Sequence, residues 1–124
     1  MSDRGLHELT LAYVECFCAS DLDSLAQLLA RDLEFSGPYL RCHTAADYLA
    51  HLRSDPPEPA EFRIIAMKAL AADAVGIEWQ YRKPGDSLLL WQHFTVRNGR
   101  IAKIRLEFRS GGKEVMGSQS KGTE

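Results

Sequence analysis

The segment at 88–108, with the sequence LLLWQHFTVRNGRIAKIRLEF, decides the fold of this chain. Asn98-Gly99 stands near its centre and is the dipeptide most typical of a two-residue turn between antiparallel strands. After this turn, apolar and charged residues alternate; the apolar set is Ala102, Ile104, Leu106 and Phe108, and the charged set is Lys103, Arg105, Glu107 and Arg109. A period of two predicts strands at 88–97 and 101–109, each with one buried and one solvated face.

The same period extends upstream of this hairpin. Residues 74–82 alternate in the same way, and their apolar members are Val75, Ile77, Trp79 and Tyr81. The composition of 62–67 is typical of a further strand, and Lys83-Pro84-Gly85-Asp86 predicts a second hairpin turn. Three prolines at 55–59 exclude a helix or a central strand there. The C-terminal half is therefore predicted to be a meander of antiparallel strands.

The N-terminal half has helical periodicity instead. A first helix is expected at 3–19, and Ser20 is interpreted as the N-cap of a second helix whose apolar stripe is Leu22, Leu25, Ala26 and Leu29. A short strand at 33–36 ends at Gly37-Pro38. Thr44 caps a third helix at 44–53. The residues of this helix expected to face inward are Ala45, Tyr48, Leu49 and Leu52. Helices followed by a meander predict an α+β fold, a curved sheet with helices on its concave side.

Composition excludes several classes of function. The 124 residues predict one domain at 1–109 and a flexible polar tail at 110–124. Fifteen Lys and Arg residues against seventeen Asp and Glu leave a net charge of −2 without a basic cluster, so no nucleic-acid partner is expected. The start of the chain has no signal-peptide pattern and no apolar run is long enough for a bilayer, so we expect a cytoplasmic protein without a membrane partner.

A set of short matches along the chain resembles one superfamily. The matching stretches are Tyr13-Val14, 19–25, 28–32, Gly37-Pro38, Thr44-Ala45-Ala46, Gln92-His93-Phe94 and Asn98-Gly99-Arg100. In this order and spacing they resemble the nuclear transport factor 2-like superfamily, in its SnoaL-like and ketosteroid isomerase-like branch. The resemblance implies a cone-shaped, strongly curved mixed or antiparallel sheet wrapped around the N-terminal helices, a cystatin-like α+β roll. It also implies a pocket for small apolar molecules and, often, a dimer.

The resemblance carries over only part of the isomerase machinery. Ketosteroid isomerases use a carboxylate base and an oxyanion hole made of a tyrosine and a protonated carboxylic acid. The tyrosine falls on Tyr13, which is either a pocket donor or an ordinary core tyrosine. The base falls on Gly37 and the acid on Gln92, so the proton acceptor is missing. The Gln92 amide can still donate a hydrogen bond, so Tyr13 and Gln92 together could bind a polarised oxygen.

His51 is the remaining candidate for acid–base chemistry. It corresponds to a position where the isomerases carry a pocket tyrosine, and an imidazole titrates near neutral pH. The alternative is a surface or structural histidine on the flank of its helix. The expected catalytic set is therefore Tyr13, His51 and Gln92. The expected ligand-binding set, which would serve equally as a filled core, is Phe17, Phe35, Trp79, Tyr81, Phe94, Leu106 and Phe108.

Two hypotheses on function remain open after these assignments. The first is a cofactor-free isomerase, cyclase or dehydratase acting beside a carbonyl, and the second is a noncatalytic ligand-binding or dimerisation module. No metal site is expected, because the four histidines are dispersed and the three cysteines lack a C-x-x-C spacing. Trp91, a large apolar group predicted on the outer face of the sheet, indicates a homodimer through that face.

Overall fold

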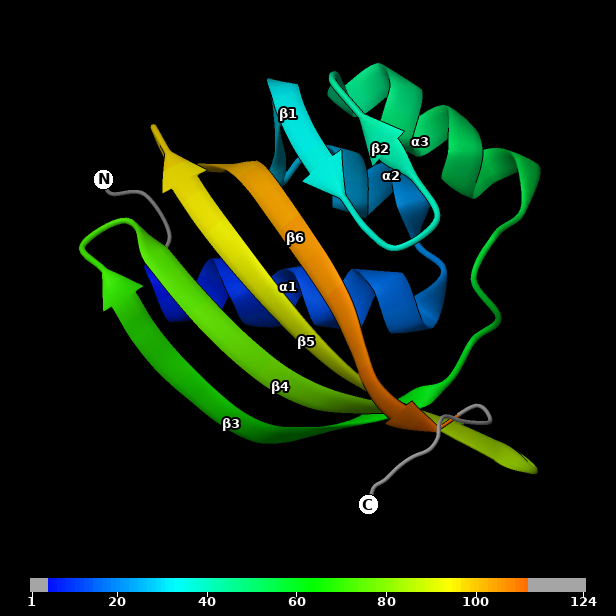
Figure 1. The fold of residues 1–124 in the computed structure, drawn as a ribbon. Coiled ribbons are helices and arrows are strands. Elements are labelled where there is room, and N and C mark those ends of the chain that lie inside the picture. Colours follow the sequence, from blue (N-terminus) through cyan, green and yellow to red (C-terminus); the bar gives the residue numbers. More distant parts are fainter. Residues whose placement is uncertain (1–4, 112–124) are drawn as a thin grey trace.

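A curved sheet of six strands wraps around helix α1 in the computed structural model, which describes residues 5–111 (Figure 1). The elements in chain order are α1 (Leu6–Ala19), α2 (Leu22–Ala26), β1 (Leu29–Ser36), β2 (Arg41–Cys42), α3 (Ala45–Ser54), β3 (Glu61–Ala71), β4 (Ala74–Lys83), β5 (Asp86–Arg97) and β6 (Arg100–Gly111). Within these residues the strand order is β2-β1-β6-β5-β4-β3, and β1 is parallel to β6 while the other neighbours are antiparallel. The predicted α+β class with a mixed, curved sheet is confirmed.

The central hairpin forms as the sequence predicts. Arg97 pairs with Arg100 across a two-residue turn, in which Asn98 and Gly99 both have positive φ angles, 54° and 76°. Positive φ at both central residues defines the turn whose twist matches that of the flanking strands. The second turn also forms, with a positive φ at Gly85. The chain from β4 to β6 is therefore one continuous antiparallel meander.

Bulges in two strands bend the sheet into an open cone. β6 carries an extra residue at Ala102, and β3 carries one at Ile65, where the strand pairings change register. Such insertions kink a strand and increase its twist. The bulge in β6 also brings both Ile101 and Ala102 to the buried side, whereas strict alternation predicts only Ala102 there.

Helix α1 crosses the concave side of the sheet (Figure 1). Its buried residues are Leu9, Thr10, Tyr13, Val14 and Cys18. The residues before position 5, where its start is expected, lie outside the described part. Two helix-end assignments need correction. Ser20 ends α1 in a left-handed conformation, and Asp21 caps α2 by accepting a hydrogen bond from the Ser24 N–H at 3.2 Å. Helix α2 is also shorter than expected, because Leu29 already pairs with Ile101 at the start of β1.

The start of α3 and the end of β6 lie close to the positions expected from the sequence. Thr44 caps α3 as predicted, with its hydroxyl accepting from the Asp47 N–H at 3.0 Å. β6 continues to Gly111, two residues beyond the expected domain boundary, and the rest of the predicted polar tail lies outside the described residues. No helix within 5–111 has the length and apolarity needed to cross a bilayer.

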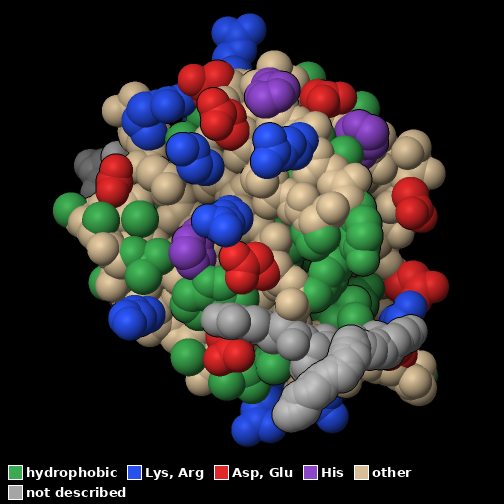
Figure 2. Space-filling view, viewed as in Figure 1, with side chains coloured by type: hydrophobic (Ala, Val, Ile, Leu, Met, Phe, Trp, Pro, Cys, Tyr) green, Lys and Arg blue, Asp and Glu red, His purple; other side chains and the backbone are tan. Residues whose placement is uncertain are grey.

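Trp91 lies on the outer face of the sheet, as the alternation in β5 predicts. Its indole N–H donates to Nε2 of His93 at 2.6 Å, and its ring lies over Gly76 on the neighbouring strand β4. Charged side chains are scattered over this face (Figure 2). Because the indole packs on its own sheet, it is half-buried within one chain. That a second copy covers the rest of it stays a prediction.

Gly76→Ala should destabilise the fold by about 1–3 kcal/mol, the usual cost of overpacking. A Cβ at this position would lie 2.7 Å from the Trp91 ring, so the indole must move. Alanine in a strand is otherwise more favourable than glycine, which makes the sign of the change diagnostic. Urea unfolding measures the free energy. In a Trp91→Ala background the penalty should shrink, and an equal penalty in both backgrounds would show that the contact is unimportant.

Candidate functional site

An aromatic pocket lies between the concave side of the sheet, α1 and α3. Its volume is about 190 Å³, and its lining comes from all of these elements and from the loop between β1 and β2. The lining residues are Tyr13, Phe17, Phe35, Gly37, Pro38, Tyr39, Leu40, Tyr48, Leu52, Trp79, Leu90, Gln92, Leu106 and Phe108. We call this set the aromatic pocket. The curved sheet therefore leaves a space beside Tyr13 that the side chains do not fill.

The mouth of the aromatic pocket is apolar as well. Tyr39 is 89% exposed and Phe108 is 43% exposed, with their ring centres 6.2 Å apart. Figure 2 shows apolar side chains gathered between β6 and the loop that joins β1 to β2. Large apolar groups left in contact with water at the rim of a cavity are typical of an entrance for an apolar ligand.

Two hydrogen-bonded pairs form the polar end of the aromatic pocket. The hydroxyls of Tyr13 and Tyr48 lie 2.5 Å apart, and both residues are buried. The indole N–H of Trp79 donates to Oε1 of Gln92 at 2.7 Å. This bond occupies the carbonyl oxygen of the Gln92 side chain, so its NH₂ group is left as the donor. The polar end therefore joins α1, α3, β4 and β5 around one point.

Burial keeps both tyrosines of this pair protonated. Burial raises the pKa of Tyr13 to about 12, although hydrogen bonds from Tyr48 and Gln92 lower it somewhat. Burial also raises the pKa of Tyr48 well above its ordinary value, and Tyr13 raises it further. The pair carries two hydroxyl protons, and either oxygen can be the donor of the bond between them. One hydroxyl proton is therefore not used within the pair, and an acceptor oxygen in the pocket can take its hydrogen bond.

Seven of the predicted site residues lie in the lining of the aromatic pocket, and three do not. Those in the lining are Tyr13, Phe17, Phe35, Trp79, Gln92, Leu106 and Phe108. Phe94 is fully buried outside the lining, in an edge-on contact with Tyr13 whose ring centres are 5.0 Å apart. Tyr81 packs edge-on against Phe17 and donates its hydroxyl proton to the backbone carbonyl of Glu58. Both residues therefore support the lining from outside.

His51 lies away from the aromatic pocket. Its side chain is 51% exposed, and its Nε2 lies 3.7 Å from Oδ1 of Asp47 on the same helix. The face of α3 that reaches the pocket is made by Tyr48 and Leu52 instead. This placement does not support His51 as the proton-handling group of the aromatic pocket. Tyr48 is a polar residue of the pocket that was expected only in the core. The feature of the sequence that points to it is its place on the inward stripe of the third helix.

The lining contains no acid–base group. Among residues 5–111, no Asp, Glu, His, Lys or Arg side chain lines the aromatic pocket. Gly37 occupies the position where the isomerase resemblance implies the base, and Glu34 on the neighbouring strand is exposed. The described lining therefore offers hydrogen-bond donors to a bound oxygen, and no carboxylate or imidazole stands beside them.

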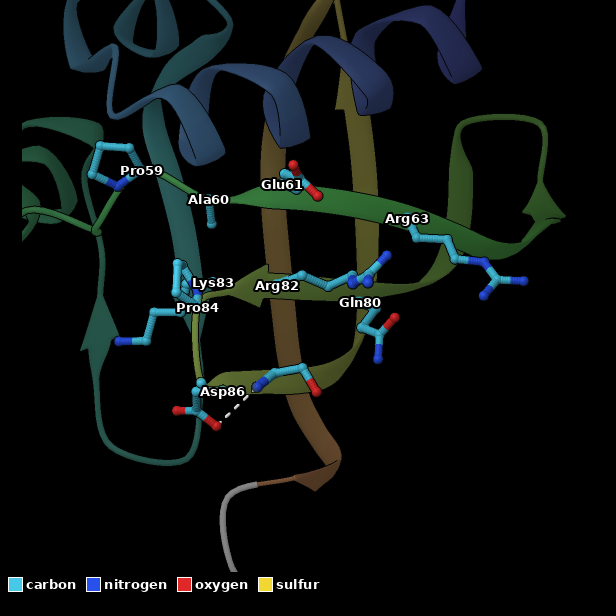
Figure 3. Close-up of a pocket in the computed structure, with 11 residues that line it drawn as sticks. Pro59, Ala60, Glu61, Arg63, Gln80, Arg82, Lys83, Pro84 and Asp86 are labelled. Carbon is cyan, nitrogen blue, oxygen red and sulfur yellow. Dashed lines mark hydrogen bonds between the residues drawn. The ribbon is translucent and has the colours of Figure 1, made fainter.

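A larger hollow lies on the outer face, at the ends of β3, β4 and β5, but its side chains do not converge. It measures about 1080 Å³, and Arg63, Gln80 and Lys83 extend from it in different directions (Figure 3). Asp86 is already bonded to the backbone N–H of Ser87 at 2.8 Å. A site that binds a small molecule needs groups that meet on one point, so we assign the candidate site to the aromatic pocket.

Comparison with known proteins supports this fold. The family model of the SnoaL-like domain matches residues 10–104. Among solved structures, the chain is similar to an NTF-2-like protein of unknown function from Burkholderia xenovorans LB400, with 19% identity, a TM-score of 0.73, and 94% and 95% of the two chains covered. A candidate ketosteroid isomerase from Kribbella flavida DSM 17836 is 16% identical over 96% of this chain and 91% of that one, with a TM-score of 0.73.

An LEH-like epoxide hydrolase from M. tuberculosis is also similar in structure, at 21% identity and a TM-score of 0.67, with 82% of this chain and 80% of that chain covered. No curated protein matches the chain significantly by sequence. At these identities the structural likenesses show a shared fold. One fold of this kind hosts several chemistries, so the function has to be argued from the pocket itself.

Proposed function

Because the chain belongs to the SnoaL-like domain family, we propose that its aromatic pocket binds a small, neutral, mainly apolar molecule and holds one carbonyl or hydroxyl oxygen of that molecule against Tyr13. The observation that carries the proposal is the polar end of the pocket. Aromatic and aliphatic walls lead to one cluster of neutral donors, Tyr13, Tyr48 and Gln92, and to no charged group among the described residues.

The walls define the class of ligand. Burial of an apolar molecule against aromatic rings is favourable by roughly 25 cal/mol per Å² of apolar surface removed from water. A charged ligand would lose its hydration without gaining an opposite charge, so the pocket disfavours it. A volume of about 190 Å³ at interior packing density holds on the order of ten non-hydrogen atoms. The ligand class is therefore a small cyclic or branched ketone or alcohol.

The polar end defines the orientation of the ligand. When Tyr48 donates to the Tyr13 oxygen, the Tyr13 proton is available and Tyr13 becomes a stronger donor to a further oxygen. A ligand carbonyl placed there accepts that bond beside buried side chains, whereas a pure hydrocarbon leaves this hydroxyl proton unpaired. Leaving a buried donor unpaired costs about 1–3 kcal/mol. The pocket should therefore prefer molecules with an oxygen at one end.

Isomerase, cyclase or dehydratase chemistry is the second candidate function. The observation in its favour is the same Tyr13–Tyr48 pair, since hydrogen bonds to a carbonyl oxygen stabilise the charge that develops when a neighbouring proton leaves. Such chemistry also requires a base, and the lining among residues 5–111 provides none. We therefore rank ligand binding above catalysis as the proposed function. Catalysis in this pocket would need a substrate that carries its own base.

1-Indanone and indane form a matched pair of probes for the proposal. They have nearly the same shape, and only the ketone carries an oxygen. We expect the wild-type protein to bind 1-indanone about fivefold more tightly than indane, the equivalent of one net hydrogen bond of about 1 kcal/mol. Ligand-observed NMR titration measures both dissociation constants, and a rise in melting temperature gives an independent readout.

Tyr13→Phe is the variant that separates binding at the polar end from binding elsewhere. It removes the hydroxyl and keeps the ring, so the affinity for indane should hold while the preference for 1-indanone disappears. Tyr39→Phe, at the exposed mouth, is the matched control and should keep the preference. A wild-type protein that binds neither probe, or a preference that survives in Tyr13→Phe, would refute the proposed role of the pocket.

A further inference from the structure

Three side chains of the metal-binding type meet between β2 and α3. They are Cys42 from β2 and Asp47 and His51 from α3, and one ligand atom of each lies within 4.8 Å of the other two. The distance between Oδ1 of Asp47 and Nε2 of His51 is 3.7 Å. Within residues 5–111 no other group of three His, Cys, Asp or Glu side chains meets in this way.

The local fold brings these side chains together. Asp47 and His51 are one helical turn apart, so they share a face of α3. The Thr44 hydroxyl accepts from the Asp47 N–H at 3.0 Å, which fixes the first turn of this helix. Cys42 pairs with Phe35 in the sheet, just before that turn, and β2 lies alongside α3 (Figure 1). The thiol is therefore held by a strand while the other two donors are held by a capped helix.

The donor set fits zinc. Thiolate, imidazole and carboxylate are the protein ligands of Zn²⁺, bound at about 2.0–2.3 Å in a tetrahedron. Ligand atoms in such a tetrahedron lie roughly 3.5 Å apart, so the Asp47–His51 distance already suits a shared ion, and the thiol needs a shift of about 1 Å or less. A set of one sulfur, one nitrogen and one oxygen ligand disfavours Mg²⁺ and Ca²⁺, because these ions prefer oxygen ligands.

We propose that Cys42, Asp47 and His51 bind one Zn²⁺ ion, with water as the fourth ligand. Room for water exists because the Asp47 and His51 side chains are about half-exposed, 53% and 51%, whereas Cys42 is buried at 1%. On binding, the sulfur–hydrogen bond of Cys42 breaks, the proton goes to solvent, and the sulfur keeps the electron pair that it gives to the metal.

The consequence for the fold is a link between β2 and α3. Tyr48, which belongs to the polar end of the aromatic pocket, directly follows Asp47 on α3. An ion held by Cys42 and by two successive turns of α3 would fix the helix that positions Tyr48. The site needs no ligand in the aromatic pocket, so its test is independent of the proposed function.

Zinc and cobalt titrations of the full chain test this site. Calorimetry with Zn²⁺ should give one ion per chain, and zinc should raise the melting temperature. Co²⁺ in place of zinc should give the near-ultraviolet absorption of a thiolate bound to cobalt. A protein that takes up no zinc, or a cobalt spectrum without the thiolate band, would overturn the proposal.

Matched variants then identify the ligands. His51→Gln is the main variant, because the exposed side chain can be replaced without disturbing the core; it should weaken zinc binding at least about tenfold. His43→Gln, at an exposed neighbouring histidine, should leave the affinity unchanged. Cys42→Ala should abolish the thiolate band, and Cys18→Ala, at another buried cysteine, should keep it. Equal affinities in His51→Gln and His43→Gln would also overturn the proposal.

Discussion

Gly37→Asp should give the aromatic pocket the base that it lacks, and should accelerate hydrogen–deuterium exchange beside the carbonyl of bound 1-indanone by about 10²–10⁴-fold, the usual contribution of a positioned base. A Cβ at Gly37 would lie 3.1 Å and 3.3 Å from two ring atoms of Phe35 and 3.8 Å from Cβ of Leu106. Both neighbours line the pocket, so the new carboxylate starts at its wall. The Phe35 ring has to shift by only a few tenths of an ångström to admit it.

The matched control for this variant is Gly37→Asn, which has nearly the same shape but no basic oxygen. NMR in D₂O follows the loss of the protons at the carbon next to the ketone, with the ligand near saturation. Wild type and Gly37→Asn should exchange at the rate of buffer alone. Equal rates in the Asp and Asn variants, with 1-indanone bound to both, would show that the polar end does not activate the carbonyl. Exchange above buffer in wild type would favour the second candidate function.

The folded protein should lose about 3 kcal/mol of stability in alkali through Tyr13 alone. The pKa of Tyr13 is about 12 in the folded state against an ordinary value of 10, because burial disfavours the charged form. A group whose pKa is raised by folding contributes its full stability below the unfolded value. This contribution is lost as the pH rises from 10 to 12, and Tyr48 acts in the same direction.

Urea unfolding at pH 9, 10 and 11 measures this loss. At pH 11 the Tyr13 contribution to the decline should reach about 1–2 kcal/mol. Tyr13→Phe removes the titrating group and should flatten the decline by that amount, although it changes the stability at pH 9 as well. Tyr39→Phe is the control, since Tyr39 is on the surface. An equal decline in wild type and Tyr13→Phe would mean that Tyr13 is not held in a dry, neutral state.

Local signals in the sequence account for much of the fold. Asn98-Gly99 predicts its turn because only a few residues tolerate positive φ at both positions, and Thr44 predicts the start of α3 because its hydroxyl satisfies a free N–H. The end of α2 was not predictable in this way. Leu29 fits the helical stripe, but its pairing with Ile101 is a contact between residues far apart in sequence, and this contact overrides the local preference.

The candidate site is only partly predictable for the same reason. The face of each strand follows from alternation, so Trp79, Gln92 and Leu106 could be assigned to the pocket. The inward stripe of α3 follows from its periodicity as well, and Tyr48 and Leu52 of this stripe line the pocket. His51 lies on the flank of the stripe, a small rotation away, and its half-exposed side chain is outside the lining. The grouping of His51 with Cys42 likewise depends on how β2 lies against α3, which no spacing in the sequence shows.

The infrared stretch of the 1-indanone carbonyl, measured with the carbonyl carbon labelled with ¹³C, tests the central claim most directly. A hydrogen bond from Tyr13 weakens the carbonyl bond and lowers its stretching frequency. We expect bound 1-indanone to absorb at a lower frequency than it does in hexane, and most of this shift to disappear in Tyr13→Phe. A bound ketone with the frequency found in hexane, or a shift that Tyr13→Phe leaves intact, would contradict an oxygen-binding site at Tyr13.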